Sequence, residues 1–152
     1  MIKVLFLCHG NICRSPMAEF IFKDISKEYR KKLYINSKAV SGEELGSSIY
    51  FSAQKKLKEK NIPFDNHIAS QITLSDYNEY DYIIVMEERN ISRLMGIIGS
   101  DAEKKVYKLL DFTSRGDDIE DPWYSGNFEK VFCDIFEGCQ GLLHHLIKKG
   151  EI

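Results

Sequence analysis

The first seventeen residues constrain the fold more than any other segment of the chain. Residues 2–7 (IKVLFL) lack the polar alternation of a strand with one wet face, so we interpret them as a strand buried on both faces, which is typical of parallel sheets covered by helices. Apolar residues recur at helical spacing from Met17, and Ser15 and Pro16 supply an N-cap and a first-position proline. We therefore expect a helix from about Pro16, joined to the strand by a short turn that begins at Cys8.

The rest of the chain repeats this alternation of strands and helices. Further strands are predicted at 33–40, 80–86 and 105–110, and helices at 53–60, 88–95 and 128–146. The stretch 111–127 has no apolar period and is predicted to be a long loop, which in a compact domain usually serves function. Alternation of this kind predicts an α/β fold with three α/β/α layers. Right-handed crossovers then place the carboxyl ends of the strands, Cys8 included, along one edge where ligands bind.

Length and charge limit the kind of protein this can be. The chain has 152 residues, of which 43% are hydrophobic and 12% aromatic, enough to close a core, and we expect residues 1–152 to form a single domain. Its 21 basic residues are balanced by 23 acidic ones, giving a net charge of −2. A chain without a basic surplus is not built mainly to hold nucleic acid, so we expect no nucleic-acid partner.

The cellular setting is predicted from the N-terminus and the cysteines. The first apolar run, Val4 to Cys8, is too short for a signal-peptide core or a membrane span. We expect a cytoplasmic protein with no membrane partner. The four cysteines are then expected to serve thiol chemistry or packing rather than disulfides, with Cys139 in the core.

The turn CHGNICRSP between strand and helix has the composition of an anion cradle. Gly10 and Asn11 tolerate the left-handed backbone that such a turn requires. Inward-pointing amides and the positive end of the following helix attract an anion, and the planar fork of Arg14 matches two oxygens of a phosphate. A tetrahedral dianion fits this charge. The turn is not a nucleotide P-loop, because the G-x-x-x-x-G-K-[ST] pattern is missing.

Cys8 converts this cradle into a candidate catalyst. The groups that attract phosphate also favour thiolate over thiol, and the thiolate is the nucleophilic form. A purely structural role for Cys8, packing at the end of the strand, would not explain why Arg14 follows six residues later and is itself followed by Ser-Pro. A zinc site is disfavoured, because Cys8, His9 and Cys13 lack a second ligand pair at short spacing. We expect no metal.

At these residues the sequence resembles the low-molecular-weight protein tyrosine phosphatases, whose signature C-x5-R-S-P corresponds to Cys8 through Pro16. The similarity continues in YDYIIVMEERN (80–90) and in EDPWYSGNFEKV (120–131), which looks like the family's Asp-Pro-aromatic-aromatic acid loop. The resemblance implies a four-stranded parallel sheet, a phosphocysteine intermediate and no metal or organic cofactor. It also implies a phosphotyrosine-containing protein or peptide as substrate, phosphate as product inhibitor, and we expect a monomer.

The resemblance assigns the catalytic roles. Cys8 would attack phosphorus while Arg14 and the loop amides hold the equatorial oxygens. Asp121 would be the general acid for the phenolate leaving group. The residues alone do not select it from the acidic run of this loop, which is usually just solvated. Pro122 does favour it, because proline biases the preceding residue towards an extended backbone.

Further site residues follow from the resemblance and from their place in the loops. Asn11, Ser15, Ser37 and His67 match positions that support the anion loop through mutual hydrogen bonds, with the Ser15 hydroxyl also facing the sulfur. Cys13 matches a cysteine that can form a reversible disulfide with the nucleophile, or it is simply a small buried side chain. The remaining candidates are expected to line the cleft, with Gly10 and Ile12 in the loop and His9 as either an added positive charge or an exposed ring. Trp123 and Tyr124 are expected to form aromatic walls, the alternative being that they are simply buried in the core. Glu43 is expected to form an acidic wall where many relatives place an aromatic ring.

Three alternative functions stay open. Protein arginine phosphatases share this fold but carry threonine where this chain has Ile12, and an apolar branched residue there favours a flat aromatic ring. Thioredoxin-coupled arsenate reductases share the C-x5-R loop but need further cysteines near 80–90, and residues 82–89 contain none. A non-catalytic phosphate-binding module would not need Cys8, Arg14 and Asp121 together. Phosphotyrosine hydrolysis is therefore the favoured prediction.

Overall fold

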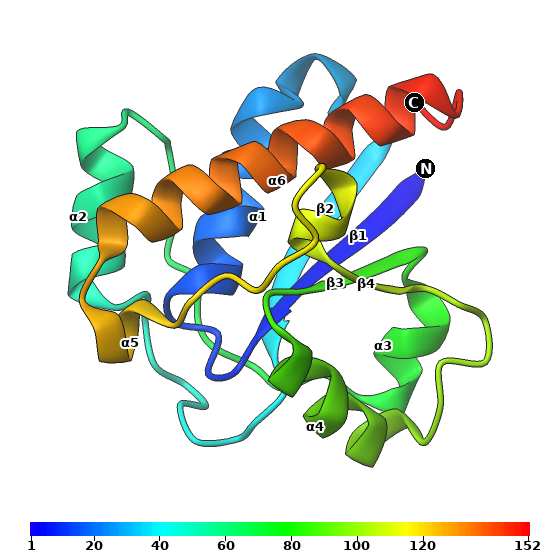
Figure 1. Ribbon diagram of the computed structural model, residues 1–152, viewed down its shortest axis with the longest axis horizontal. Helices are drawn as coiled ribbons and strands as arrows, with labels where there is room; N and C mark the ends of the chain where they lie inside the picture. The colour runs from blue at the N-terminus through cyan, green and yellow to red at the C-terminus, as the bar shows by residue number, and fades with distance from the viewer.

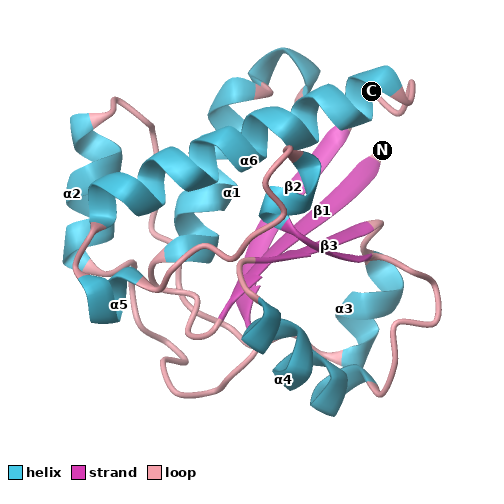
Figure 2. Ribbon diagram, in the orientation of Figure 1, coloured by secondary structure: helices cyan, strands magenta, loops and turns pink.

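The computed structural model describes residues 1–152 and contains one four-stranded parallel sheet in the order β2-β1-β3-β4. Figure 1 shows the sheet running through the middle of the molecule, and Figure 2 separates its strands from the helices on either side. The strands are β1 (Ile2–Cys8), β2 (Leu33–Ala39), β3 (Tyr82–Val85) and β4 (Val106–Lys108). This arrangement confirms the predicted α/β/α sandwich with four parallel strands.

Strand β1 lies in the interior of the sheet, paired in parallel with β2 on one side and β3 on the other. Its alternate side chains enter two separate cores, as a strand with both faces covered requires. Val4, Phe6 and Cys8 belong to the larger core, whereas Leu5 and Leu7 belong to the smaller one. The expectation of a doubly buried strand is confirmed, and it places the sulfur of Cys8 at the carboxyl edge of the sheet.

Helices cover both faces of the sheet unequally. On one face α1 (Arg14–Ile25), α2 (Phe51–Glu59) and α6 (Phe128–Lys148) pack on one another, and on the other face α3 (Leu74–Glu79) packs on α4 (Glu88–Ile98). The short helix α5 (Pro122–Ser125) directly precedes α6 in the chain. Two 3-10 turns, η1 (Lys27–Tyr29) and η2 (Leu109–Phe112), are the remaining elements. In none of these helices does the apolar stretch reach the length needed to traverse a bilayer.

Two short helices were not predicted from the sequence. Helix α3 is too short to show an apolar period, and a capping box between Thr73 and Asp76 holds its first turn. Helix α5 falls within the stretch 111–127, whose prediction as an unbroken loop is wrong. The predicted strand 105–110 is also wrong in its second half, because β4 ends at Lys108 and the chain then turns into η2.

Two glycines of α6 let the helix touch η2 at backbone distance. A Cβ added to Gly141 would lie 2.2 Å from the carbonyl oxygen of Phe112, and one added to Gly138 would lie 2.4 Å from Cγ of Leu109. No larger residue fits at either position without moving the backbone or a core leucine. This contact fixes the place where the chain enters the segment that leads to α5.

We expect Gly141→Ala to lower the free energy of unfolding by about 1–3 kcal/mol or more, because the new methyl group overlaps a backbone oxygen. The matched control is Gly96→Ala, since Gly96 lies in α4 with nothing within 4 Å of its added Cβ. That change should stabilise the protein by about 0.5–1 kcal/mol, because alanine is the better helix former. Urea denaturation measures both, and equal effects would contradict the close contact.

Candidate functional site

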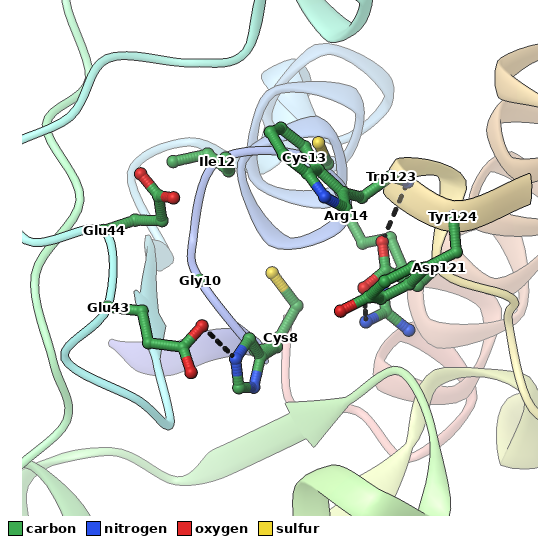
Figure 3. A pocket seen from close by; sticks show the side chains of 11 residues that line it. Cys8, Gly10, Ile12, Cys13, Arg14, Glu43, Glu44, Asp121, Trp123 and Tyr124 are labelled. Carbon is green, nitrogen blue, oxygen red and sulfur yellow. Dashed lines mark hydrogen bonds and ion pairs between the residues drawn. The ribbon is translucent and has the colours of Figure 1, made fainter. Parts of the chain in front are cut away.

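A cavity of about 240 Å³ opens at the carboxyl end of β1. Figure 3 shows the sulfur of Cys8 pointing into it, with the loop after β1 curving around the sulfur. The cavity brings together side chains from three distant parts of the chain, namely the loop after β1, the loop before α2, and α5 with the residue that precedes it. Its lining residues are Cys8, His9, Gly10, Ile12, Cys13, Arg14, Glu43, Glu44, Asp121, Trp123 and Tyr124.

The loop after β1 makes its turn at a single left-handed residue. Asn11 has a φ of 61°, which asparagine tolerates better than most residues. The same prediction for Gly10 is wrong, because Gly10 does not have a positive φ. Gly10 instead leaves room for the side chain of Glu44, since a Cβ at position 10 would lie 3.2 Å from Cγ of Glu44.

Helix α1 begins at Arg14, earlier than predicted, and its N-cap is Cys13. The predicted N-cap role of Ser15 is therefore wrong. Ser15 lies inside the first turn, where its hydroxyl oxygen is 3.0 Å from the sulfur of Cys8. The helix has no side-chain cap, so its first amide groups lack that partner at the mouth of the cavity.

The buried amide of Asn11 determines which way the protons of this network point. Its Oδ1 accepts from the backbone N–H of Ser70 at 3.3 Å, and a backbone N–H can only donate, so the oxygen end of the amide is fixed. Its Nδ2 therefore donates to Ser15 Oγ at 2.8 Å and to Ser37 Oγ at 3.0 Å. The Ser15 proton remains free to donate, and its shorter contact is to the sulfur of Cys8 rather than to the carbonyl of Lys38 at 3.4 Å.

The predicted contacts of Ser37 and His67 with this loop are present. His67 Nε2 lies 2.9 Å from Asn11 Oδ1 and donates to it, and Ser37 donates at 2.7 Å to Glu19. Glu19 is a residue of this network that the sequence analysis missed, because a single acid within an otherwise helical stretch carries no distinctive signal. It is buried in α1 beside Lys23, at 2.6 Å.

Arg14 is 2% exposed and ties the loop to two other segments. Its Nη1 donates at 2.5 Å to Glu87 and at 2.9 Å to the carbonyl of Ile119, and its Nη2 lies 3.4 Å from Asp121 Oδ2. Burial lowers the pKa of Arg14, but the negative charges of Cys8, Asp121 and Glu87 outweigh burial and raise it overall. The guanidinium therefore keeps its positive charge inside the protein.

Glu87 was also missed, although its position offered a signal. It follows β3, whose carboxyl end shares an edge with that of β1 in a parallel sheet. Asn90 fixes the turn by accepting from the backbone N–H groups of Met86 at 3.0 Å and of Glu87 at 3.1 Å. An acidic residue at that edge could have been matched to the buried arginine.

Asp121 is the residue directly before α5, and it lines the cavity. It has the extended backbone that Pro122 was expected to favour, and its Oδ1 accepts from the N–H of Trp123 at 3.0 Å as the N-cap of α5. Trp123 and Tyr124 are 52% and 83% exposed, so neither ring is buried in the core. They lie in the first turn of α5 rather than in a loop. Trp123 packs against Tyr50, with ring centroids 4.8 Å apart.

The wall opposite these rings is acidic. Glu43 Oε2 lies 2.9 Å from Nε2 of His9, and this contact lowers the pKa of Glu43. Glu44, which the sequence analysis did not select, stands beside it, and Figure 3 shows both carboxylates across the cavity from Trp123 and Tyr124. His9 is therefore half-exposed and paired rather than a free ring.

The four cysteines are all free thiols. Cys13 is buried at the cavity, and its burial, together with the neighbouring Cys8, raises its pKa. Cys139 is fully buried, as predicted, and Cys133 is exposed. No three histidine, cysteine, aspartate or glutamate side chains gather as metal ligands would.

Comparison with known proteins gives one consistent family. A sequence profile described as "Low molecular weight phosphotyrosine protein phosphatase" matches residues 3–151. The chain is 38% identical, over the full length of both proteins, to the low molecular weight protein-tyrosine-phosphatase YfkJ of Bacillus subtilis. The crystal structure of YfkJ matches with a TM-score of 0.93 and 39% identity, covering 98% of this chain and 96% of that one.

Two further solved structures share the architecture. The low molecular weight protein tyrosine phosphatase SP-PTP from Streptococcus pyogenes matches with a TM-score of 0.86 and 39% identity, over 96% of this chain and 93% of that one. A Drosophila arginine phosphatase, DARP, matches with a TM-score of 0.85 and 29% identity, over 95% of this chain and 97% of that one. The relatives thus include phosphatases with two different substrate names.

We expect Asn11→Ala to destabilise the protein by about 1–3 kcal/mol more than Asn61→Ala, because it leaves buried hydrogen-bonding groups without a partner. Asn61 is the matched control: it is also left-handed, with a φ of 58°, but it is exposed and only its backbone forms a hydrogen bond. Urea denaturation gives the stabilities, and calorimetry with orthophosphate should show weaker binding for Asn11→Ala alone. Equal behaviour of the two variants would mean that the amide network does not hold the loop.

Proposed function

Because the chain belongs to the low molecular weight protein-tyrosine-phosphatase family, we propose that it hydrolyses phosphotyrosine and small aryl phosphates through a phosphocysteine intermediate on Cys8. The observation that carries this proposal is the convergence of Cys8, Arg14 and Asp121 on one cavity, with the guanidinium 3.4 Å from the carboxylate. A nucleophile, an anion-binding cation and a proton donor are the three groups that the reaction needs.

In the first step the Cys8 thiolate attacks phosphorus, so that an S–P bond forms as the bond from phosphorus to the phenolic oxygen breaks. Protonated Asp121 gives its proton to that oxygen, and tyrosine leaves as the neutral phenol. Arg14 and the amides at the start of α1 hold the equatorial phosphoryl oxygens, where charge is concentrated in the transition state. The hydroxyl of Ser15 lies 3.0 Å from the sulfur and can donate a hydrogen bond to it.

In the second step water attacks the phosphocysteine, an O–P bond forms and the S–P bond breaks. Asp121, now a carboxylate, takes the proton from the water, and the Cys8 thiolate and phosphate are released. Phosphate fits the same cradle as the substrate and therefore competes with it. We propose that the enzyme needs no metal or organic cofactor, because each proton and charge in these two steps has a partner among these side chains. We also propose that it works as a monomer, because the residues that line the cavity all come from one chain.

The shape of the cavity favours an aromatic substrate. Ile12 lines the cavity, Trp123 and Tyr124 form one wall, and a flat phenyl ring packs well on such apolar surfaces. Arginine phosphatase is the second candidate, because a solved structure named as one shares this fold at 29% identity. Ile12, which offers a guanidinium no hydrogen bond, ranks phosphotyrosine first.

The other two alternatives have less support. Disulfide relay in an arsenate reductase would need cysteines near the start of α4, but the cysteines lie at positions 8, 13, 133 and 139. A non-catalytic module gives no reason for a buried sulfur that accepts from Ser15 or for a carboxylate held beside Arg14. Arsenate-dependent oxidation of thioredoxin would support the first alternative, and phosphopeptide binding without turnover would support the second.

We expect Cys8→Ser to abolish turnover of aryl phosphates while retaining orthophosphate binding. Asp121→Ala should lower kcat/KM by about 10²- to 10⁴-fold for phosphotyrosine, whose phenol needs a proton, and much less for p-nitrophenyl phosphate. Asp24→Ala is the matched control, since Asp24 lies in α1 and does not line the cavity. Mass spectrometry of Asp121→Ala quenched by denaturant at neutral pH, where a phosphohistidine would also survive, should find phosphate on Cys8. Phosphate on His9 or His67 instead, or activity that a chelator removes, would overturn the mechanism.

Substrate preference is measured with two peptides of the same sequence, one containing phosphotyrosine and the other phosphoarginine. In competition we expect the phosphotyrosine peptide to be consumed first, because Ile12 and the aromatic wall bury a ring better than a guanidinium. The readout is the ratio of the two kcat/KM values from phosphate release. A ratio in favour of phosphoarginine would move the protein to the second candidate function.

A further inference from the structure

We propose that Arg115 is a positioning residue for Asp121, holding the segment that carries this carboxylate against α6. This inference rests on the proposed role of Asp121 as general acid. Arg115 lies between η2 and α5, outside the cavity, and nothing in the reaction itself calls for it. Its contacts nevertheless make it the best-connected charged side chain of that segment.

The guanidinium of Arg115 is held on both sides. Its Nε and Nη2 donate to the two carboxylate oxygens of Asp117 at 3.0 and 2.9 Å, which braces the segment internally. Its Nη1 donates to Asp134 at 2.7 Å and to Glu137 at 3.2 Å, both on α6. A planar fork that satisfies three carboxylates fixes the distance between segment and helix better than a single ion pair does.

Asp134 is the partner of Arg115 on α6 that most needs a cation. It is buried in α6, and its Oδ2 has no hydrogen-bond partner, so the Arg115 contact is the one that satisfies its other oxygen. Lys130 Nζ lies 4.0 Å from that Oδ2, beyond hydrogen-bond reach, so Arg115 is the one cation that donates a hydrogen bond to this buried carboxylate, which would be costly without it. The Arg115–Asp134 ion pair therefore holds the segment between η2 and α5 against α6.

The path from Arg115 to Asp121 is short and anchored along its length. Ile119 is fully buried, its N–H donates to the carbonyl of Met86 at 2.9 Å, and its own carbonyl accepts from Arg14. Glu120 is held at 2.5 Å by Lys130, which lies one helical turn before Asp134 on the same face of α6. The segment thus meets α6 at two points that flank Ile119, and Asp121 follows directly.

The consequence for catalysis is geometric. A general acid must lie within hydrogen-bond reach of the leaving oxygen, and a displacement of about 1 Å from a distant change can cost about 100-fold in rate. Loss of the Arg115 clamp should therefore slow substrates that need the proton and spare those that do not. Oxyanion binding, which uses the loop after β1, should not change.

The test compares Arg115→Met and the double variant Arg115→Met/Asp134→Asn, which avoids leaving a bare buried charge, with the wild type. We expect kcat/KM for phosphotyrosine to fall about 10- to 100-fold in both, with a much smaller loss for p-nitrophenyl phosphate. Arg115→Lys should recover part of the loss, because one ammonium still reaches Asp134. Vanadate affinity and near-UV circular dichroism should match the wild type.

The decisive measurement places the same substitutions in an Asp121→Ala background, where no acid is left to position and no further loss is expected. Lys60→Met is the control, since Lys60 also links to α6, through Glu129 at 2.9 Å, but does not touch the segment. Equal losses for both substrates, a further loss without Asp121, weaker vanadate binding or no loss at all would each overturn the proposal. If Asp121→Ala alone shows no leaving-group dependence, the proposed function fails as well, and that single variant identifies this case.

Discussion

The buried amide of Asn11 is the interaction on which the rest of the site depends. Its left-handed backbone turns the chain back from β1 towards α1, and its side chain then accepts from Ser70 and donates to Ser15 and Ser37. Because each end of the amide is committed, the Ser15 hydroxyl has its proton to spare for the sulfur of Cys8. One residue therefore sets both the turn of the loop and the direction of the hydrogen bond at Cys8.

Charge in the site is arranged around a single deep cation. Arg14 is buried, yet it is surrounded by the acidic side chains of Glu87 and Asp121 and by the carbonyl of Ile119. These partners come from segments far apart in the chain, so the guanidinium joins the loop after β1 to the turn after β3 and to the segment before α5. The positive charge that we propose binds phosphate is thus also what holds these three segments together.

The sequence carries more information about the start of the site than about its far wall. Residues 2–7 and the turn after them could be interpreted because a doubly buried strand and a strand-to-helix turn each have a local signature. Glu19 and Glu87 could not be selected with the same ease, since their roles depend on partners distant in sequence. Asp121 was singled out through a family resemblance, and Pro122 alone among its neighbours supported that choice. The Ser15 error arises because helix α1 starts earlier than its proline suggests, so that Cys13 becomes the cap. The Gly10 error arises because the left-handed conformation of the turn falls on Asn11 alone.

The two walls of the cleft differ in kind, with the rings of Trp123 and Tyr124 on one side and the carboxylates of Glu43 and Glu44 on the other. A phosphopeptide lying between them would have an apolar surface on one side of its phosphorylated residue and a negatively charged surface on the other. The mouth of the cavity is therefore asymmetric, apolar at one flank and negatively charged at the other. The proposed peptide substrate would meet unequal surroundings in its two possible orientations across this opening.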